Sequence, residues 1–227
     1  MPASCRVPDL AEWEYCVQHA ACAGGGPMQQ PVIELWFDFG SNYSYLSVMR
    51  IGREAERRGV ALAWKPFMLG PILRELGWSD SPFVVQETKG RYVWRDMERQ
   101  CAKFGLPWNR PRTFPRRAVL PHRVALWGES EAWIADFCRT VMMRNFVEDR
   151  DIDSDQAMFQ VLGALGLPPE PIIEAARSPA NKERLREQTD EARARGVFGA
   201  PTFFVGDEMF WGNDRMDDAL ELASRAG

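Results

Sequence analysis

The stretch VIELWFDFGSNYSYL, residues 32–46, decides the fold predicted for this chain of 227 residues. Bulky and β-branched residues dominate positions 32–39, which predicts a buried strand. Gly40 and Ser41 break that strand, and apolar residues then recur at helical spacing over positions 42–58. A second strand follows over residues 60–65. The opening is therefore β-α-β, with Ser41 at the junction between the first strand and the helix.

The rest of the chain divides into a helical block and a closing hairpin with a helix. Six helices are expected within residues 87–195, over 89–104, 118–128, 133–146, 154–165, 170–177 and 179–195. Strands over 202–205 and 208–211 flank the turn Gly206-Asp207, and Asp214 is expected to cap a last helix over 215–225, with Asp217 completing a variant capping box. A β-α-β unit, a helical block and a β-β-α unit form the α/β plan of thioredoxin-like domains.

This pattern predicts two structural units and an extension. Residues 31–84 and 186–227 would form the thioredoxin-like domain, and residues 85–185 an all-helical insertion between its halves. Residues 1–30 are expected to be a disordered extension, because Gly24-Gly25-Gly26-Pro27 separates them from the first strand. An alternative is that the true start is Met28, directly ahead of that strand.

Composition narrows the class of protein. Hydrophobic residues make up 45% and charged residues 26% of the chain, and the net charge of −4 argues against a nucleic-acid binder. No stretch is apolar for long enough to cross a membrane, and the start lacks the pattern of a secretory signal, so the sequence predicts a cytoplasmic protein. The five cysteines form no Cys-x-x-Cys pair, and no metal-ligand spacing is present. Small buried side chains are the favoured interpretation of these cysteines.

Three segments carry candidate chemistry. Ser41 stands at a helix start, where unpaired N–H groups and the helix dipole stabilise an anion, although a serine there is more often only a helix cap. Pro201, preceded by Ala200, enters the third strand. The run Trp211-Gly212-Asn213-Asp214 leads into the last helix, and its simplest interpretation is again a cap.

Together the segments FDFGSNYSYL, KGRYVWRDMER and VFGAPTFFVGDEMFWGNDRM, in this order and spacing, resemble the 2-hydroxychromene-2-carboxylate isomerases, relatives of the kappa-class glutathione transferases. The resemblance runs from about residue 32 to the C-terminus. It implies glutathione as cofactor, with Ser41 as the catalytic residue that hydrogen-bonds to its thiolate. It also implies that Pro201 is cis, that Ala200 pairs with glutathione through its backbone, and that the Trp211–Asp214 run holds the γ-glutamyl end.

The same resemblance implies a glutathione-dependent cis-trans isomerase of aromatic carboxylates, active in aromatic hydrocarbon catabolism, and it suggests a homodimer. A kappa-like glutathione transferase and a non-enzymatic glutathione or peptide binder are the alternatives; a disulfide oxidoreductase is disfavoured because serines replace both cysteines of its motif. The family's serine is usually followed by proline, where this chain has Asn42. Residues 70–81 also depart from the relatives, so the residues of the substrate pocket are not carried over from the family position by position.

Candidate residues for the substrate follow from its chemistry, which needs apolar walls and a cation. The candidate walls are Trp36, Trp78 and Trp94, and the candidate cations Lys65, Arg74, Lys89 and Arg91, each of which is more simply a core or surface residue. A further basic cluster comprises Arg110, Arg112, Arg116 and Arg117; a solvated loop is favoured over an anion-attracting patch.

Deleting residues 1–27 is expected to leave fold and activity unchanged, because the glycine-rich break precedes the first predicted strand. Thermal unfolding and turnover of the truncated and full-length chains test this. A large drop in the melting temperature on truncation would mean that the segment packs on the core.

Overall fold

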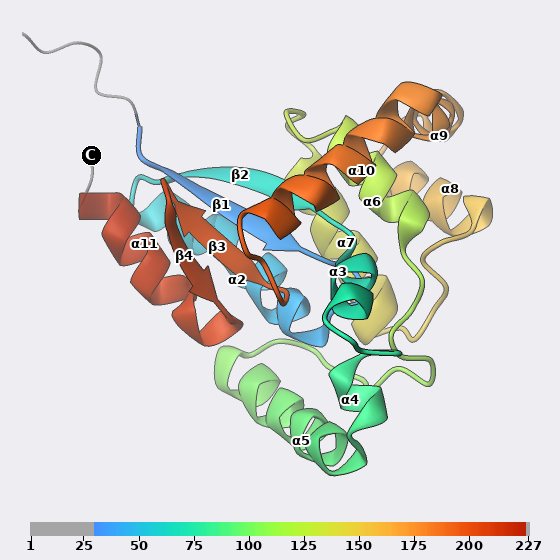
Figure 1. The fold of residues 1–227 in the computed structure, drawn as a ribbon. Coiled ribbons are helices and arrows are strands. Elements are labelled where there is room, and N and C mark those ends of the chain that lie inside the picture. The colour runs from blue at the N-terminus through green and yellow to red at the C-terminus, as the bar shows by residue number, and fades with distance from the viewer. Residues whose placement is uncertain (1–29, 226–227) are drawn as a thin grey trace, which may run out of the picture.

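The computed structural model describes residues 30–225, which form a four-stranded mixed sheet covered by helices (Figure 1). The strands are β1 (Val32–Phe37), β2 (Ala61–Pro66), β3 (Thr202–Val205) and β4 (Glu208–Trp211), in the order β2-β1-β3-β4. β1 pairs in parallel with β2 and antiparallel with β3, which pairs antiparallel with β4. The predicted β-α-β and β-β-α halves therefore meet in one sheet through β1 and β3.

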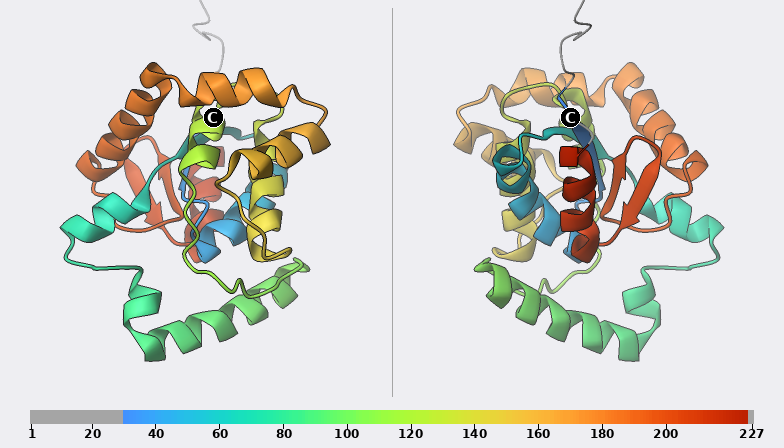
Figure 2. Two further views of the ribbon diagram at one scale, coloured as in Figure 1. Left: turned by 90° about the vertical axis from the view of Figure 1, so that its right-hand side faces the viewer. Right: turned by 90° about the vertical axis from the view of Figure 1, so that its left-hand side faces the viewer.

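Helices fill the connections. They are α2 (Asn42–Arg57), α3 (Leu69–Glu75), α4 (Pro82–Val85), α5 (Glu87–Phe104), α6 (Val119–Trp127), α7 (Ile134–Phe146), α8 (Asp155–Ala164), α9 (Pro169–Arg177), α10 (Pro179–Ala194) and α11 (Met216–Arg225). α4 and α5 lie across the bottom of the molecule in both views of Figure 2, while α8, α9 and α10 gather toward the opposite end.

Two hydrophobic clusters cover the two faces of the sheet. Leu35 and Phe203 belong to the larger cluster, which includes residues of α2, α7 and α11. Their neighbours Trp36 and Phe204 belong to the smaller cluster with Ala192 of α10. Since successive strand residues point to opposite faces, the alternation places α2 and α11 on one side of the sheet and α10 on the other. Because α2 packs on one face of the sheet, its first turn lies next to the end of β1.

The structure differs from the sequence prediction in three places. β1 ends at Phe37 rather than at residue 39, because the N–H of Phe39 donates to the His122 side chain instead of continuing the sheet. α3 and α4 were not predicted: both are short, and Gly70-Pro71 reads as a break although proline is tolerated in the first turn of a helix. Asp214 does not cap α11, as described below.

The proposed division into domains remains a prediction. The boundary at 185/186 falls within α10, whose Leu185 and Ala192 are both buried. The extension predicted over residues 1–30 lies, apart from Gln30, outside the described residues, as do Cys5, Cys16 and Cys22.

The described cysteines are buried and carry no disulfide. Burial raises the pKa of the Cys101 thiol to about 12, and that of Cys138 lies well above its ordinary value for the same reason. These two therefore behave as small apolar side chains, as expected from the sequence.

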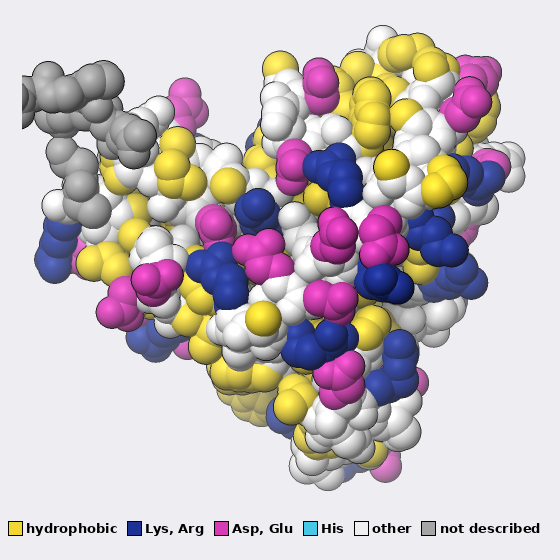
Figure 3. Space-filling model, turned by 45° about the horizontal axis from the view of Figure 1, so that its top comes forward, with side chains coloured by type: hydrophobic (Ala, Val, Ile, Leu, Met, Phe, Trp, Pro, Cys, Tyr) yellow, Lys and Arg dark blue, Asp and Glu magenta, His cyan; other side chains and the backbone are white. Residues whose placement is uncertain are grey.

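Charged groups of both signs are interspersed on the face that Figure 3 presents. Within residues 30–225, no helix is long and apolar enough to span a bilayer.

Candidate active site

Ser41 is the N-cap of α2, and its hydroxyl joins the two halves of the fold. Its backbone is extended, at φ −85° and ψ 120°, and Oγ accepts a hydrogen bond from the Ser44 N–H at 3.2 Å. The same hydroxyl donates to the carbonyl oxygen of Ala200, 159 positions away, at 2.8 Å. Ala200 precedes Pro201 through a cis peptide bond, as the resemblance implies. Ser41 is therefore a helix cap and, through the same hydroxyl, also a hydrogen-bond donor to the cis-proline segment.

The start of α2 leaves donors unpaired beside this hydroxyl. Ser41 accepts from the N–H groups of Ser44 and Tyr45, through its side chain and its carbonyl respectively. The N–H groups of Asn42 and Tyr43 find no acceptor within residues 30–225. Unpaired donors at a helix start carry the positive end of its dipole, so they favour an anion next to the Ser41 hydroxyl.

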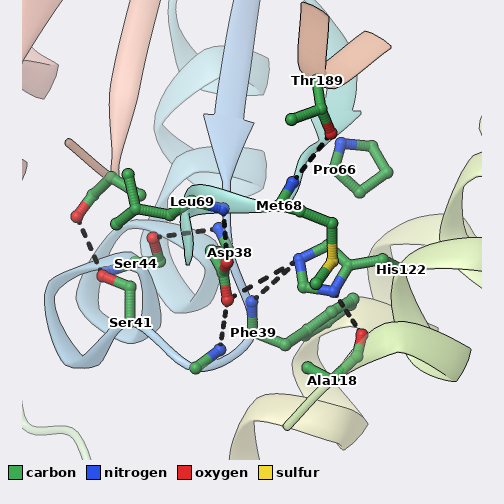
Figure 4. A network of polar contacts seen from close by, with 12 residues as sticks. Asp38, Phe39, Ser41, Ser44, Pro66, Met68, Leu69, Ala118, His122 and Thr189 are labelled. Atoms are coloured by element: carbon green, nitrogen blue, oxygen red, sulfur yellow. Dashed lines mark hydrogen bonds and ion pairs between the residues drawn. The ribbon is translucent and has the colours of Figure 1, made fainter. Parts of the chain in front are cut away.

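A buried polar network holds the turn before Ser41 in place (Figure 4). Asp38 accepts from the Gly40 N–H through Oδ1 at 2.7 Å and from the Leu69 N–H through Oδ2 at 2.9 Å. The carboxylate therefore ties the β1–α2 turn to the start of α3. His122 of α6 lies behind this turn, with Nε2 at 3.7 Å from Asp38 Oδ1.

His122 is fully buried, and its contacts define its tautomer. Nε2 accepts from the Phe39 N–H at 3.3 Å, so this nitrogen carries the lone pair. Nδ1 then carries the hydrogen and donates to the Ala118 carbonyl oxygen. Neither Asp38 nor His122 was predicted as a site residue, and their only signal in the sequence is a carboxylate placed at the end of a buried strand.

The Gly212-Asn213-Asp214 turn adjoins the cis-proline segment. The N–H of Gly212 donates to the Pro201 carbonyl oxygen at 2.9 Å, and Gly212 has a φ of 106°, which favours glycine. Asn213 is buried, whereas the Asp214 carboxylate is exposed and pairs with Arg215.

The predicted capping box of Asp214 and Asp217 is wrong. The chain enters a 3-10 turn over Asn213–Arg215 directly after Gly212, so Asp214 is already inside a helical turn. From that position its side chain makes no bond to the backbone of α11, and Asp217 pairs with Arg50 and Arg58 instead.

The start of α2, the cis-proline segment and the Gly212–Asp214 turn border one cavity of about 1190 Å³, whereas His122 lies outside its lining. The cofactor residues predicted from the sequence are all among its lining: Ser41, Ala200, Pro201, Trp211, Gly212, Asn213 and Asp214. Trp211 is half exposed and packs against the ring of Phe198. The structure therefore brings the predicted cofactor site together on one wall.

The opposite wall comes from α3, α4 and α5, and it holds part of the predicted substrate set. Trp78, Arg74 and Lys89 line the cavity. Trp36 does not, because it is fully buried in the smaller core cluster, where its ring packs against Phe67 and Phe204. The other residues outside the lining are Trp94, which packs on Trp108 and Phe114, Lys65, which lies over Trp36, and Arg91, which pairs with Glu87.

The basic cluster is largely neutralised by acidic partners. Arg112 and Arg116 both pair with Asp149, and this hydrogen bonding lowers the pKa of the Asp149 carboxyl. Arg117 pairs with Asp153. Arg116 and Arg117 also line the cavity, so the cluster contributes to the site although most of its charge is paired.

Asn42 is a buried polar residue without a partner. It is fully buried at the first position of α2, and neither Oδ1 nor Nδ2 has a hydrogen-bond partner among the described residues. Each unpaired buried polar group costs about 1–3 kcal/mol. Its position is the one at which the resembled family usually carries proline.

Replacing Asn42 with proline is expected to raise the free energy of unfolding by about 1 kcal/mol, or the melting temperature by about 2–4 °C. The change removes both unpaired atoms, proline suits the first turn of a helix, and the extended backbone of Ser41 is the conformation that a following proline requires. Thermal unfolding measures the effect. A lower melting temperature would mean that the Asn42 amide has a stabilising partner in solution.

Comparisons with known proteins agree with this geometry. The chain matches the DSBA-like thioredoxin domain family over residues 32–223 and belongs to that class. A 2-hydroxychromene-2-carboxylate isomerase of Sphingobium xenophagum is 30% identical over 195 residues, which cover 82% of this chain and 94% of that protein. Within the thioredoxin class, this chain therefore belongs to the 2-hydroxychromene-2-carboxylate isomerase family of enzymes.

A solved structure and a second group of enzymes are also similar to this chain. A solved structure of 2-hydroxychromene-2-carboxylate isomerase superposes with a TM-score of 0.77 at 27% identity, covering 86% of this chain and 95% of that one. Glutathione s-transferase kappa 2 of Caenorhabditis elegans is 24% identical over 205 residues, which cover 84% of this chain and 91% of the transferase. The isomerase thus shares this arrangement of sheet and helices, and the kappa transferases are related to the chain by sequence.

Proposed function

We propose that this chain is a glutathione-dependent isomerase of 2-hydroxychromene-2-carboxylate or a closely similar aromatic carboxylate. Membership of the isomerase family supports the reaction. The observation that carries the cofactor is the single cavity wall on which the Ser41 hydroxyl, the Ala200 carbonyl and the Gly212–Asp214 turn converge. The kappa transferases among the relatives have glutathione in their name, which supports the same cofactor.

The donors and acceptors on this wall fit a thiol peptide with charged ends. The amide Nδ2 of Asn213 has no acceptor within residues 30–225 and suits a carboxylate, while the exposed Asp214 carboxylate suits an ammonium group. The unpaired N–H groups at the start of α2 suit a thiolate. These residues would hold the γ-glutamyl end and the sulfur of glutathione.

We propose an exchange of hydrogen-bond partners at Ser41. In the structure the Ser41 hydroxyl donates to Ala200, whose carbonyl is the acceptor that a bound extended peptide would use. A peptide N–H on the Ala200 carbonyl would take over that bond and leave the Ser41 hydroxyl to donate to the sulfur. Ser41 keeps its cap to Ser44 throughout, since that bond uses an oxygen lone pair.

Catalysis then divides between cofactor and protein. Bound glutathione would supply a thiolate nucleophile for a reversible addition to the ring-opened substrate, which is redox-neutral because the thiolate would be released unchanged. Ser41 and the start of α2 stabilise the thiolate and orient it. Trp78 offers an apolar surface, and Arg74 and Lys89 offer cations for the substrate carboxylate.

Titration calorimetry with glutathione tests the cofactor site. We expect one binding site per chain, weakened by substitutions at Ser41 and Asn213. Failure to bind at millimolar glutathione would contradict the assignment.

A transferase is the second candidate, since kappa transferases are among the relatives. It would use the same thiolate but retain it in the product. Mass spectrometry of the reaction products separates the two: an isomerase yields a product of unchanged substrate mass, and a transferase yields a glutathione adduct. A non-enzymatic binder would leave the substrate unconverted, so substrate and isomer are separated by chromatography before the mass is measured.

The proposal includes a cytoplasmic location, because the cytoplasm maintains the reduced glutathione that the reaction needs. A homodimer, suggested by the family resemblance, also stays a proposal. Size-exclusion chromatography with light scattering measures the mass in solution directly.

A further inference from the structure

Asn213 is held by two donors that come from α2. Its Oδ1 accepts from the Ser47 hydroxyl at 3.3 Å and from Arg50 Nη1 at 3.2 Å. All three side chains are buried, with exposed fractions of 0% for Ser47 and 8% each for Arg50 and Asn213. The contact joins segments 163 positions apart, so it is a tertiary feature of the fold.

These donors fix which way the amide faces. A guanidinium group has only N–H donors, so the Asn213 atom that meets Arg50 must be the amide oxygen. The amide nitrogen therefore lies on the other side, with two hydrogens and no acceptor within the described part of the chain. Asn213 lines the cavity, and so its NH2 group is available there as a donor.

The Arg50 guanidinium packs on an aromatic ring, and its positive charge is only partly balanced by nearby carboxylates. It lies over the ring of Phe104 at 3.6 Å from the centroid. The nearest carboxylate, Asp217, is 3.7 Å away, mostly exposed, and shared with Arg58. Burial lowers the pKa of Arg50, and Asp217 and Glu54 oppose that shift. A partly compensated positive charge thus lies next to the Asn213 amide oxygen at the border of the cavity, which favours an anion beside the amide nitrogen.

We propose that Arg50, together with Ser47, is a positioning residue that orients the Asn213 amide as a dedicated donor for the α-carboxylate of the γ-glutamyl residue. This inference rests on the proposed glutathione site and goes beyond it. It assigns selectivity for thiol peptides that carry this carboxylate to the contact between Arg50 and Asn213, both of which border the cavity. Arg50 acts through Asn213 and through its charge.

The test compares two thiol peptides. One is glutathione, and the other is its analogue with γ-aminobutyrate in place of the γ-glutamyl residue, which lacks the α-carboxylate but keeps the ammonium group and the thiol. Calorimetry on the wild-type chain is expected to give at least about tenfold tighter binding of glutathione, the usual value of one charge-assisted hydrogen bond.

Two variants remove the arrangement in different ways. Arg50→Met removes the donors and the charge but keeps an apolar stem over Phe104. Asn213→Asp keeps the shape, offers Arg50 an ion pair, and presents an oxygen instead of an NH2 group to the ligand. Both variants are expected to lose the preference for glutathione while binding the analogue within about twofold of wild type. Asn213→Asp should also melt no lower than wild type.

Arg53→Met is the matched control, because Arg53 is an exposed cation of the same helix that pairs only with Glu54 among the described residues. It should keep the wild-type preference. Equal weakening of both ligands by Arg50→Met would make Arg50 a merely structural residue. Wild-type glutathione binding by Asn213→Asp would overturn the role of the amide. This test remains valid even if Arg50→Met fails to fold. A wild-type chain that binds neither peptide would overturn the proposed function itself, and this inference with it.

Discussion

Replacing Ser41 with alanine is expected to reduce turnover by about ten- to a hundredfold and to lower the free energy of unfolding by only about 1–2 kcal/mol. Turnover falls because the variant loses a charge-assisted hydrogen bond from the Ser41 hydroxyl to the glutathione thiolate. The stability effect follows from losing the cap to Ser44 and the bond to Ala200. Steady-state kinetics and chemical denaturation measure the two effects, and the ultraviolet absorbance of bound thiolate should disappear.

Ser44→Ala is the matched control for this substitution. Ser44 lies on the same turn of α2 and is buried, but its hydroxyl accepts only a long bond of 3.5 Å from the Asp38 N–H. It should keep wild-type turnover with a stability loss of similar or smaller size. If Ser41→Ala retains wild-type turnover and the thiolate signal, Ser41 is only a helix cap. Ser41→Cys is a useful companion, because its thiol could trap glutathione as a mixed disulfide.

Replacing Asp38 with alanine is expected to lower the free energy of unfolding by about 2–4 kcal/mol. The change leaves the N–H groups of Gly40 and Leu69 without their acceptor, and each unpaired group costs about 1–3 kcal/mol. Because Asp38 also fixes the turn that carries Ser41, turnover should fall with stability. Chemical denaturation and kinetics of the same preparation measure both quantities.

Asp38→Asn keeps the shape of the side chain and refines this prediction. Its amide can accept from only one of the two N–H groups and turns a second donor toward the other. We expect a stability between wild type and Asp38→Ala. A free energy of unfolding within about 0.5 kcal/mol of wild type for Asp38→Ala would mean that the network in Figure 4 contributes little.

The parts of the fold that could be predicted are those that depend on the pattern of neighbouring residues in the sequence. The buried strand before Ser41, the helix after it and the hairpin at Gly206-Asp207 each follow from residue types within a few positions. The short helices α3 and α4 do not, because they are too short for a periodic signal and depend on packing. The end of β1 was predicted at the wrong residue because it depends on a tertiary contact: the Phe39 N–H donates to His122, which is distant in the sequence.

The candidate site divides in the same way. The family resemblance supplied Ser41, Ala200 and the Trp211–Asp214 run, and the fold brings them to one cavity. It supplied neither the Asp38–His122 network nor the hold of Arg50 on Asn213. These contacts join segments far apart in the chain, and nothing in the local sequence states which side chains will meet. Trp36, predicted as a wall of the substrate pocket, is instead fully buried in the smaller core cluster beneath α3, and residue type alone does not separate a core tryptophan from a pocket wall.

The most direct test of the account is the dependence of turnover on glutathione, followed together with the amount of glutathione recovered. We expect no isomerisation of 2-hydroxychromene-2-carboxylate without glutathione, a rate that saturates as glutathione rises, and complete recovery of free glutathione after many turnovers. Isomerisation at the full rate without glutathione, or consumption of one glutathione for each substrate converted, would contradict the proposed mechanism.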